Sequence, residues 1–129
     1  MATEVIVNDG GAPARILPFV SAATGSAGDP IILDTSGETA ASAVGFRIAG
    51  VLLTDVDTIG DLANVVMGHG CILKVNCKSD VAIGDVLQAG VARLDGVTNA
   101  SSIDFPEGAI GIALEAAGGT EQPLKVLMF

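Results

Sequence analysis

The sequence contains no tryptophan, no tyrosine and only two cysteines, and positive charge is scarce. Six Lys and Arg residues stand against fifteen Asp and Glu residues in a chain of 129, which gives a formal net charge of −9. Six scattered basic side chains cannot neutralise a row of phosphates, so this composition excludes nucleic acid and anionic membrane surfaces as partners. We expect a partner with basic or apolar surface.

Long apolar runs and targeting signals are missing as well. No run of about 18 apolar residues occurs, so we expect no membrane-spanning helix. No basic and apolar leader opens the chain, so we expect no secretory signal. Cys71 and Cys77 are interpreted as lying on one strand, where about 3.3 Å per residue places them roughly 20 Å apart, beyond disulfide reach. Two reduced thiols are therefore expected, in a product made in the cytoplasm.

Small and β-branched residues dominate what is present. Half of the residues are hydrophobic, mostly Ala, Val, Ile and Leu, and there are seventeen Gly. This mixture favours short strands and tight turns, because Gly costs roughly 1 kcal/mol against Ala inside a helix. The length suffices for one domain with its own core. We predict an all-β fold.

One order of features occurs twice along the chain: a Gly-Asp turn, a strand that opens with glycine, and a final apolar run. The copies are Gly28-Asp29, Gly50–Leu53 and Leu62–Met67, then Gly84-Asp85, Gly111–Leu114 and Leu124–Met128. Two copies are too few for a solenoid. The repeat predicts one small β-barrel or sandwich built from two related halves.

Residues 1–29 are interpreted as an extended N-terminal arm and linker, and residues 30–129 as a single β-barrel-like domain. Within the arm, residues 4–7 are a candidate short strand. Pro18 confines residues 16–20 to a sheet edge or an extended segment, and the small residues Ser21–Gly28 predict a flexible linker. Two alternatives stay open: a strand packed in its own sheet, or an arm that pairs with the sheet edge of another protein.

Several local predictions concern the body. Glu38–Val44 is expected to be a helical turn or a loop, and Phe46–Leu53 a strand. The spacing within Thr54–Met67 allows a helix, but the repeat favours a hairpin in which Leu62–Met67 pairs with Cys71–Asn76 through Gly68–Gly70. Asp95-Gly96 is expected to be a turn.

The candidate catalytic and metal-binding patterns are all incomplete. Asp55–Asp61 begins like a calcium loop, but Ile59 and Val66 occupy positions where oxygen ligands belong. His69 and Cys71 could start a zinc site, yet no second ligand pair has suitable spacing. Thr24–Gly28 lacks the first glycine of a nucleophile elbow, and no phosphate-binding loop is present. We therefore predict no catalytic, cofactor-binding or metal-binding residues, with a small hydrolase or metal-dependent enzyme using His69 as the alternative.

The repeated turn-and-strand motifs resemble the capsid decoration (cement) proteins of tailed bacteriophages. The resemblance covers roughly residues 28–129. It rests on Gly28-Asp29-Pro30, on Asp29–Ser36, on Gly50-Val51, on Gly84–Leu87, and on the ending Ile110–Leu114 with Leu124–Leu127. None of these motifs is catalytic. The resemblance implies a β-barrel or β-tulip body, often trimeric, that stabilises the shell from its outer surface.

The resemblance also implies partners and a place in the virion. The partners would be the major capsid protein and further copies of this chain, as a homotrimer, on the outer surface of the capsid. An arm of this family becomes ordered on the shell, so the predicted partner-binding residues are those of its β-prone segments: Glu4, Val5, Ile6, Val7, Ile16, Leu17 and Phe19. A phage tail or fibre module is the remaining structural alternative.

Overall fold

All regular elements in the described part of the chain are β-strands, which confirms the all-β prediction. The structure is a computed structural model, and it describes residues 5–8, 14–42, 48–77, 80–89, 94–96, 109–118 and 122–129. No helix in these ranges is long and apolar enough to cross a membrane. The strands are β1 (Ile6–Asn8), β2 (Arg15–Val20), β3 (Pro30–Leu33), β4 (Thr39–Ala41), β5 (Gly50–Leu52), β6 (Leu62–Met67), β7 (Ile72–Cys77), β8 (Asp80–Val81), β9 (Val86–Ala89), β10 (Leu94–Gly96), β11 (Ala109–Ala113), β12 (Ala117–Gly118) and β13 (Gln122–Met128).

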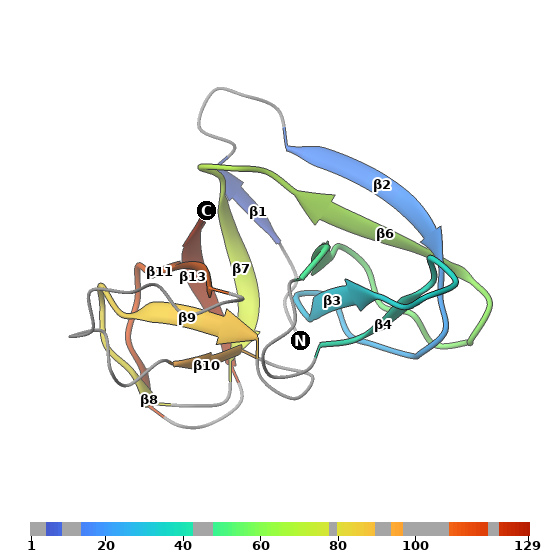
Figure 1. Ribbon diagram of the computed structural model, residues 1–129. Coiled ribbons are helices and arrows are strands. Elements are labelled where there is room, and N and C mark those ends of the chain that lie inside the picture. Colours follow the sequence, from blue (N-terminus) through green and yellow to red (C-terminus); the bar gives the residue numbers. More distant parts are fainter. Residues whose placement is uncertain are drawn as a thin grey trace.

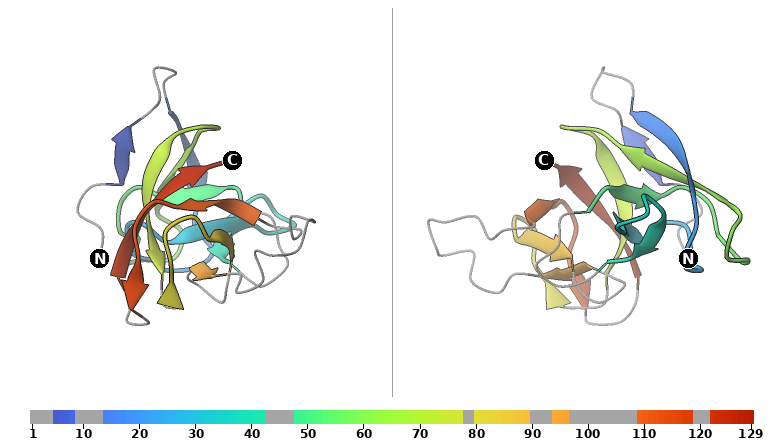
Figure 2. Two further views of the ribbon diagram at one scale, coloured as in Figure 1. Left: turned by 90° about the vertical axis from the view of Figure 1, so that its left-hand side faces the viewer. Right: turned by 45° about the vertical axis from the view of Figure 1, so that its right-hand side comes forward.

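The strands form two lobes that lie side by side (Figures 1 and 2). In the first half of the chain the order is β2-β6-β5-β3-β4, and a parallel bridge between Ser21 and Thr39 joins β2 to β4. In the second half the order is β7-β13-β11-β9-β10. A parallel pairing of Leu94 with Cys77 joins β10 back to β7. Each half is therefore a ring of five strands, as the prediction of two related halves requires.

Residue-by-residue pairing shows that the two rings have the same register. The Leu53 N–H donates to the Asn64 carbonyl at 2.8 Å, and the Leu114 N–H donates to the Lys125 carbonyl at 2.9 Å. Asn64 and Lys125 are thus equivalent. Since Pro18 lies opposite Asn64 and Lys74 lies opposite Lys125, Pro18 and Lys74 are equivalent too. Continuing this alignment along the two strands makes Val20 on β2 the counterpart of Asn76 on β7.

The two Gly-Asp turns have the same backbone structure. Gly28 and Gly84 have φ values of 93° and 91°, in the left-handed region that glycine adopts readily. The Asp29 carboxylate accepts the Ser26 N–H at 3.0 Å, and the Asp85 carboxylate accepts the Ala82 N–H at 2.9 Å. Each turn leads directly into a strand, β3 or β9.

Two glycines are required by close packing: Gly50, the first residue of β5, and Gly111, in the middle of β11. A Cβ placed on Gly50 would lie 2.6 Å from the Val65 side chain and against the Val66 carbonyl. A Cβ on Gly111 would lie 2.6 Å from the Val126 side chain and against the Leu127 carbonyl. Backbone carbonyls cannot move aside, so both positions exclude every larger residue.

Two apolar cores fill the rings. One cluster lies within the first half and contains Ile31, Leu52, Val56, Ala63 and Val65. The larger cluster fills the second half around Leu73, Val75, Leu87, Leu124 and Val126, and it also includes Val51 and Val66 from β5 and β6. The outer face of the β5–β6 pair is therefore buried in the core that the halves share.

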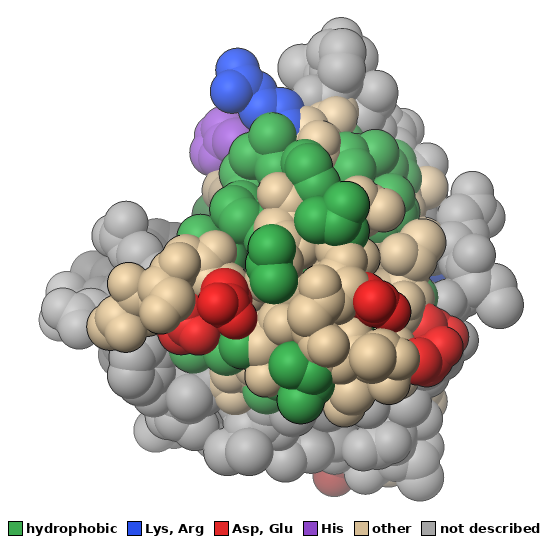
Figure 3. All heavy atoms as spheres, turned by 90° about the vertical axis from the view of Figure 1, so that its right-hand side faces the viewer, with side chains coloured by type: hydrophobic (Ala, Val, Ile, Leu, Met, Phe, Trp, Pro, Cys, Tyr) green, Lys and Arg blue, Asp and Glu red, His purple; other side chains and the backbone are tan. Residues whose placement is uncertain are grey.

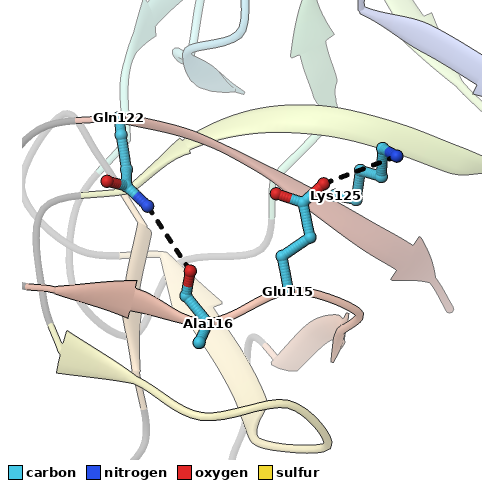
Figure 4. A network of polar contacts seen from close by, with 4 residues as sticks. All are labelled: Glu115, Ala116, Gln122 and Lys125. Carbon is cyan, nitrogen blue, oxygen red and sulfur yellow. Dashed lines mark hydrogen bonds and ion pairs between the residues drawn. The ribbon is translucent and has the colours of Figure 1, made fainter.

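The C-terminal strand is tied into the sheet on both sides. β13 pairs with β7 over six residues and with β11 over three. Beside it, the loop that follows β11 is held by Glu115, whose carboxylate lies 3.6 Å from the Lys125 ammonium, and by Gln122, whose amide donates to the Ala116 carbonyl at 3.5 Å (Figure 4). These exposed contacts contribute little stability. They orient the loop.

Two local predictions were wrong, and a third was confirmed in part. Residues 39–41 form β4 instead of a helical turn or loop, because they pair with β3 in register with Ile31–Leu33. Asp95 and Gly96 belong to β10 and pair with Gln88 and Leu87. Of the strand expected over residues 46–53, residues 50–52 are a strand, and residues 43–47 lie outside the described residues.

The predicted hairpin of β6 with β7 is also wrong, although both strands exist. β6 pairs with β2 and β5, whereas β7 pairs with β1, β13 and β10. The turn at Gly68–Gly70 directs the chain from one ring into the next: the Gly70 N–H donates to Met128 at the end of β13. The boundary between the two halves therefore lies at Gly68–Gly70, where the sequence pattern suggested a turn between two paired strands.

Candidate interaction surfaces

The N-terminal strand covers part of the edge of β7. Ile6 lies opposite Leu73 and Asn8 opposite Ile72, and the Lys74 N–H donates to the Val5 carbonyl at 2.7 Å. Val5 is 3% exposed and belongs to the shared core, and Ile6 packs against it. Glu4 and the side chain of Val7 lie outside the described residues.

The other predicted contact residues lie on β2, which is the edge strand that Pro18 predicted. Ile16 and Leu17 are 47% and 41% exposed, while Phe19 packs against the first-half core. Leu17 and Phe19 lie opposite the buried Val65 and Ala63, which places them on the inner face of β2. The structure therefore distributes the described members of the predicted contact set between two sheets.

The flexible linker predicted at Ser21–Gly28 is instead anchored to the first half. Ser21 is fully buried, and its hydroxyl donates to the Asp61 carbonyl at 2.8 Å. Gly25 bridges to Val56, and the Ala27 N–H donates to the Asp55 carboxylate at 2.7 Å. Backbone groups that are hydrogen-bonded at both ends of the segment fix its path. Whether residues 1–29 act as a unit apart from the body stays a prediction.

The contact between the two halves centres on Asn76, a residue that no sequence motif singles out. Its backbone N–H donates to the Gly28 carbonyl at 2.8 Å. Its side-chain amide donates to the Ala27 carbonyl at 2.9 Å and to the Asp29 carboxylate at 2.7 Å. These acceptors fix the amide orientation and leave the buried Asn76 Oδ1 without a partner among the described atoms. The Gly-Asp turn of the first half thus docks onto β7 of the second half.

The counterpart of that docking site is exposed on the first half. We call it the β2 face: Ile16, Pro18, Val20 and Leu62, which lie on the outer side of the β2–β6 pair. Val20 lies opposite Leu62, and the two side chains are 46% and 66% exposed. Figure 3 views the molecule from the side of these strands and shows hydrophobic side chains gathered over them. Adjoining apolar side chains on a surface mark a site of interaction more often than isolated ones do.

The counterpart of the docked turn is exposed on the second half. We call it the Ile83 turn: residues 82–85, which contain the second Gly-Asp pair. Ile83 is 70% exposed, whereas the equivalent Ala27 is 7% exposed against the shared core. One half thus has its turn buried and its strand face exposed, and the other half has the reverse.

The residues considered for chemistry are placed apart. His69 is exposed in the turn between β6 and β7. Asp55, the first residue of the incomplete calcium loop, accepts the Ala27 N–H, and Ser26 of the incomplete elbow lies in the Gly-Asp turn. Cys71 and Cys77 are buried and form no disulfide. No group of three or more His, Cys, Asp or Glu side chains in the described ranges could hold a metal ion.

Comparison with known proteins gives a structural likeness only. No family model matches the sequence, and no curated protein matches it. The fold is similar to a solved structure, the N-terminal base of the head fibre gp8.5 of bacteriophage phi29, with a TM-score of 0.70. The likeness covers 91% of this chain and 95% of that chain at 21% sequence identity. At this identity it shows a shared fold.

Proposed function

We propose that this protein is a structural component of a tailed-phage head that binds the outer surface of the major capsid protein lattice and stabilises the shell. The fold likeness to a head-fibre base, which extends over nearly the whole of both chains, is the observation that supports it. The motifs that resemble decoration proteins belong to both Gly-Asp turns and both glycine-containing strand pairs, so the resemblance concerns the folded body. A non-enzymatic role fits carboxylates that serve as turn and backbone acceptors, such as Asp29 and Asp55.

The N-terminal strand is the proposed capsid-binding element. β1 is only three residues long, and among the described strands it pairs with β7 alone, at the edge of the sheet. Its release from β7 exposes Val5, which costs about 1.5–3 kcal/mol for a fully buried valine. Addition of the released strand to a sheet edge of the capsid would replace its hydrogen bonds to β7. Binding to the assembled lattice and not to free subunits would then stabilise the shell by mass action.

A reversible lock on β1 tests this mechanism. Asn8 and Ile72 lie opposite each other, so Asn8→Cys with Ile72→Cys, in a Cys71→Ala background, would join β1 to β7 under oxidising conditions. We expect the wild type to co-sediment with empty heads of its own phage. The oxidised variant should lose this binding and recover it after reduction. Equal binding in both redox states would contradict strand release, and failure of the wild type to bind would contradict the capsid role.

A second candidate function is the base of a fibre attached to the head. It is favoured by the similar structure, which is a fibre base and not a decoration protein. Antibody labelling of intact particles separates the candidates. Label spread over the whole head surface supports the decoration role, label on projecting fibres supports the base role, and label confined to tails contradicts both.

We also propose that copies of the chain associate with one another on the shell, as a homotrimer. The exposed apolar side chains of the β2 face and the Ile83 turn support self-association.

A further inference from the structure

We infer that the β2 face of one copy binds the Ile83 turn of a second copy, so that copies associate head to tail through the contact that already joins the two halves of each chain. The inference rests on the self-association proposed above and does not depend on binding to the capsid. It names the surface, the partner and the geometry of that association.

The internal contact provides the template. In it, the Gly-Asp turn of the first half meets the outer side of β7, and Asn76 on that strand binds Ala27, Gly28 and Asp29. The contact is not symmetric, because a turn on one half binds a strand on the other. The counterparts of these two elements are therefore not used within the chain. They are β2, the equivalent strand of the first half, and the Ile83 turn, the equivalent turn of the second half.

The side chains of the two unused elements are more apolar than those of the used ones. Where the internal contact has Ala27 in the turn, the second half has Ile83, which is 70% exposed. Where it has Asn76 on the strand, the first half has Val20, which is 46% exposed. Isoleucine at this turn exposes more apolar surface to water than alanine would. Burial of both side chains against each other is the arrangement that removes this apolar surface from water.

Pro18 limits the form that the contact takes. Its equivalent, Lys74, uses its N–H to hold β1, and proline has no N–H to donate. The edge of β2 is thus unsuited to a continuous added strand. A turn needs fewer backbone bonds: by the internal template, the Val20 N–H of one copy would donate to the Gly84 carbonyl of the next. Side chains supply the rest of the contact.

A contact between unlike surfaces generates a closed ring if its rotation closes, and an open chain if it does not. Either outcome gives each copy one filled β2 face and one filled Ile83 turn, apart from the ends of an open chain. It also makes the two surfaces separable by mutation, which an identical-surface dimer does not allow.

Complementation between two variants tests the inference. Val20→Asp removes only the β2 face, and Ile83→Asp removes only the turn. Burial of an unpaired carboxylate should weaken self-association by about 100-fold or more in each variant. An equimolar mixture should form a one-to-one dimer, because the intact turn of the first variant can bind the intact β2 face of the second. Leu33→Asp, a similar exposed apolar residue outside both surfaces, is the control and should associate like the wild type.

The measurement is sedimentation velocity over a wide concentration range, with interference optics because the chain lacks tryptophan and tyrosine. Far-ultraviolet circular dichroism and thermal unfolding establish that each variant is folded. A monomeric wild type at all concentrations would overturn the inference, as would a mixture that stays monomeric. Val20→Asp that associates normally but no longer binds heads would assign the β2 face to the capsid instead. If the two variants complement each other but the wild-type protein does not bind heads, only the proposed function is contradicted.

Discussion

The two halves of this chain share one backbone plan, and their environments differ. Both Gly-Asp turns have the same left-handed glycine and the same bond from the aspartate to the backbone three residues earlier. Yet the Asp29 turn is buried between the halves, whereas the Ile83 turn that contains Asp85 is exposed. The local sequence therefore builds the turn, and the residues placed on it decide what it contacts.

The outer edges of β2 and β7 differ in the same way. β7 is covered by β1 near its start and contacted by the Asp29 turn near its end. β2 carries no added strand in the described part of the chain, and it has Pro18 where β7 has Lys74. At Pro18 the edge of β2 lacks the N–H that β7 uses to hold a strand.

The largest expected effect comes from the close-packed glycines, which are common to both halves. Gly50→Ala and Gly111→Ala each place a Cβ against a backbone carbonyl, so each should reduce the free energy of unfolding by about 3 kcal/mol, the upper end for overpacking. The measurement is urea unfolding followed by far-ultraviolet circular dichroism. Similar losses of unfolding free energy in both variants would show that the two halves are alike in stability as well as in structure.

Gly118→Ala is the matched control for this pair. A Cβ on Gly118 would meet no atom within 4 Å, and the residue lies in a β-strand, β12. We expect a change within about 0.5 kcal/mol, as for an ordinary surface substitution. If Gly50→Ala were as harmless as the control, the close approach of β5 to β6 would be incorrect.

The Gly-Asp turns should respond unequally to removal of the carboxylate. Asp85→Ala loses a partly exposed bond within the turn and should cost about 1 kcal/mol. Asp29→Ala loses the equivalent bond and also leaves the buried Asn76 amide short of an acceptor, so it should cost about 2–3 kcal/mol. Equal costs, measured by the same unfolding method, would mean that the contact with Asn76 adds nothing to stability.

Much of this architecture could be predicted because its signals are local. Gly-Asp pairs, the glycine before Val51 and the proline at residue 18 each report a backbone requirement at their own position, and the repeat gave the two-half plan. The pairing partner of a strand is not a local property. The sequence around Gly68–Gly70 is compatible with a hairpin turn, and only long-range packing sends β6 and β7 into different rings.

The candidate surfaces were harder to predict for the same reason. Val5, Ile6 and Ile16 read as one apolar arm, but burial of Val5 in the shared core and exposure of Ile16 depend on which edge of which ring each segment meets. Asn76 is an ordinary strand residue in sequence. Its role appears only when the turn at Asp29, far away along the chain, is placed against it.

Apart from the control Gly118→Ala, the smallest expected effect on stability concerns Pro18, and it bears most directly on the difference between the edges. Pro18→Ala restores an N–H at the position equivalent to Lys74, whose N–H holds β1. The free energy of unfolding should change by less than about 1 kcal/mol, because the restored group faces solvent and the lost proline restriction is of that size. The edge should nevertheless accept strands, so aggregation at high concentration, followed by thioflavin fluorescence and light scattering, should become several-fold faster. Pro123→Ala is the control, since β13 lies between two strands in the sheet, paired with β7 at Pro123 and with β11 over Val126–Met128. Unchanged aggregation of Pro18→Ala would mean that something other than the missing donor protects β2, and the apolar side chains of the β2 face, covered by a second copy, would then be the remaining protection.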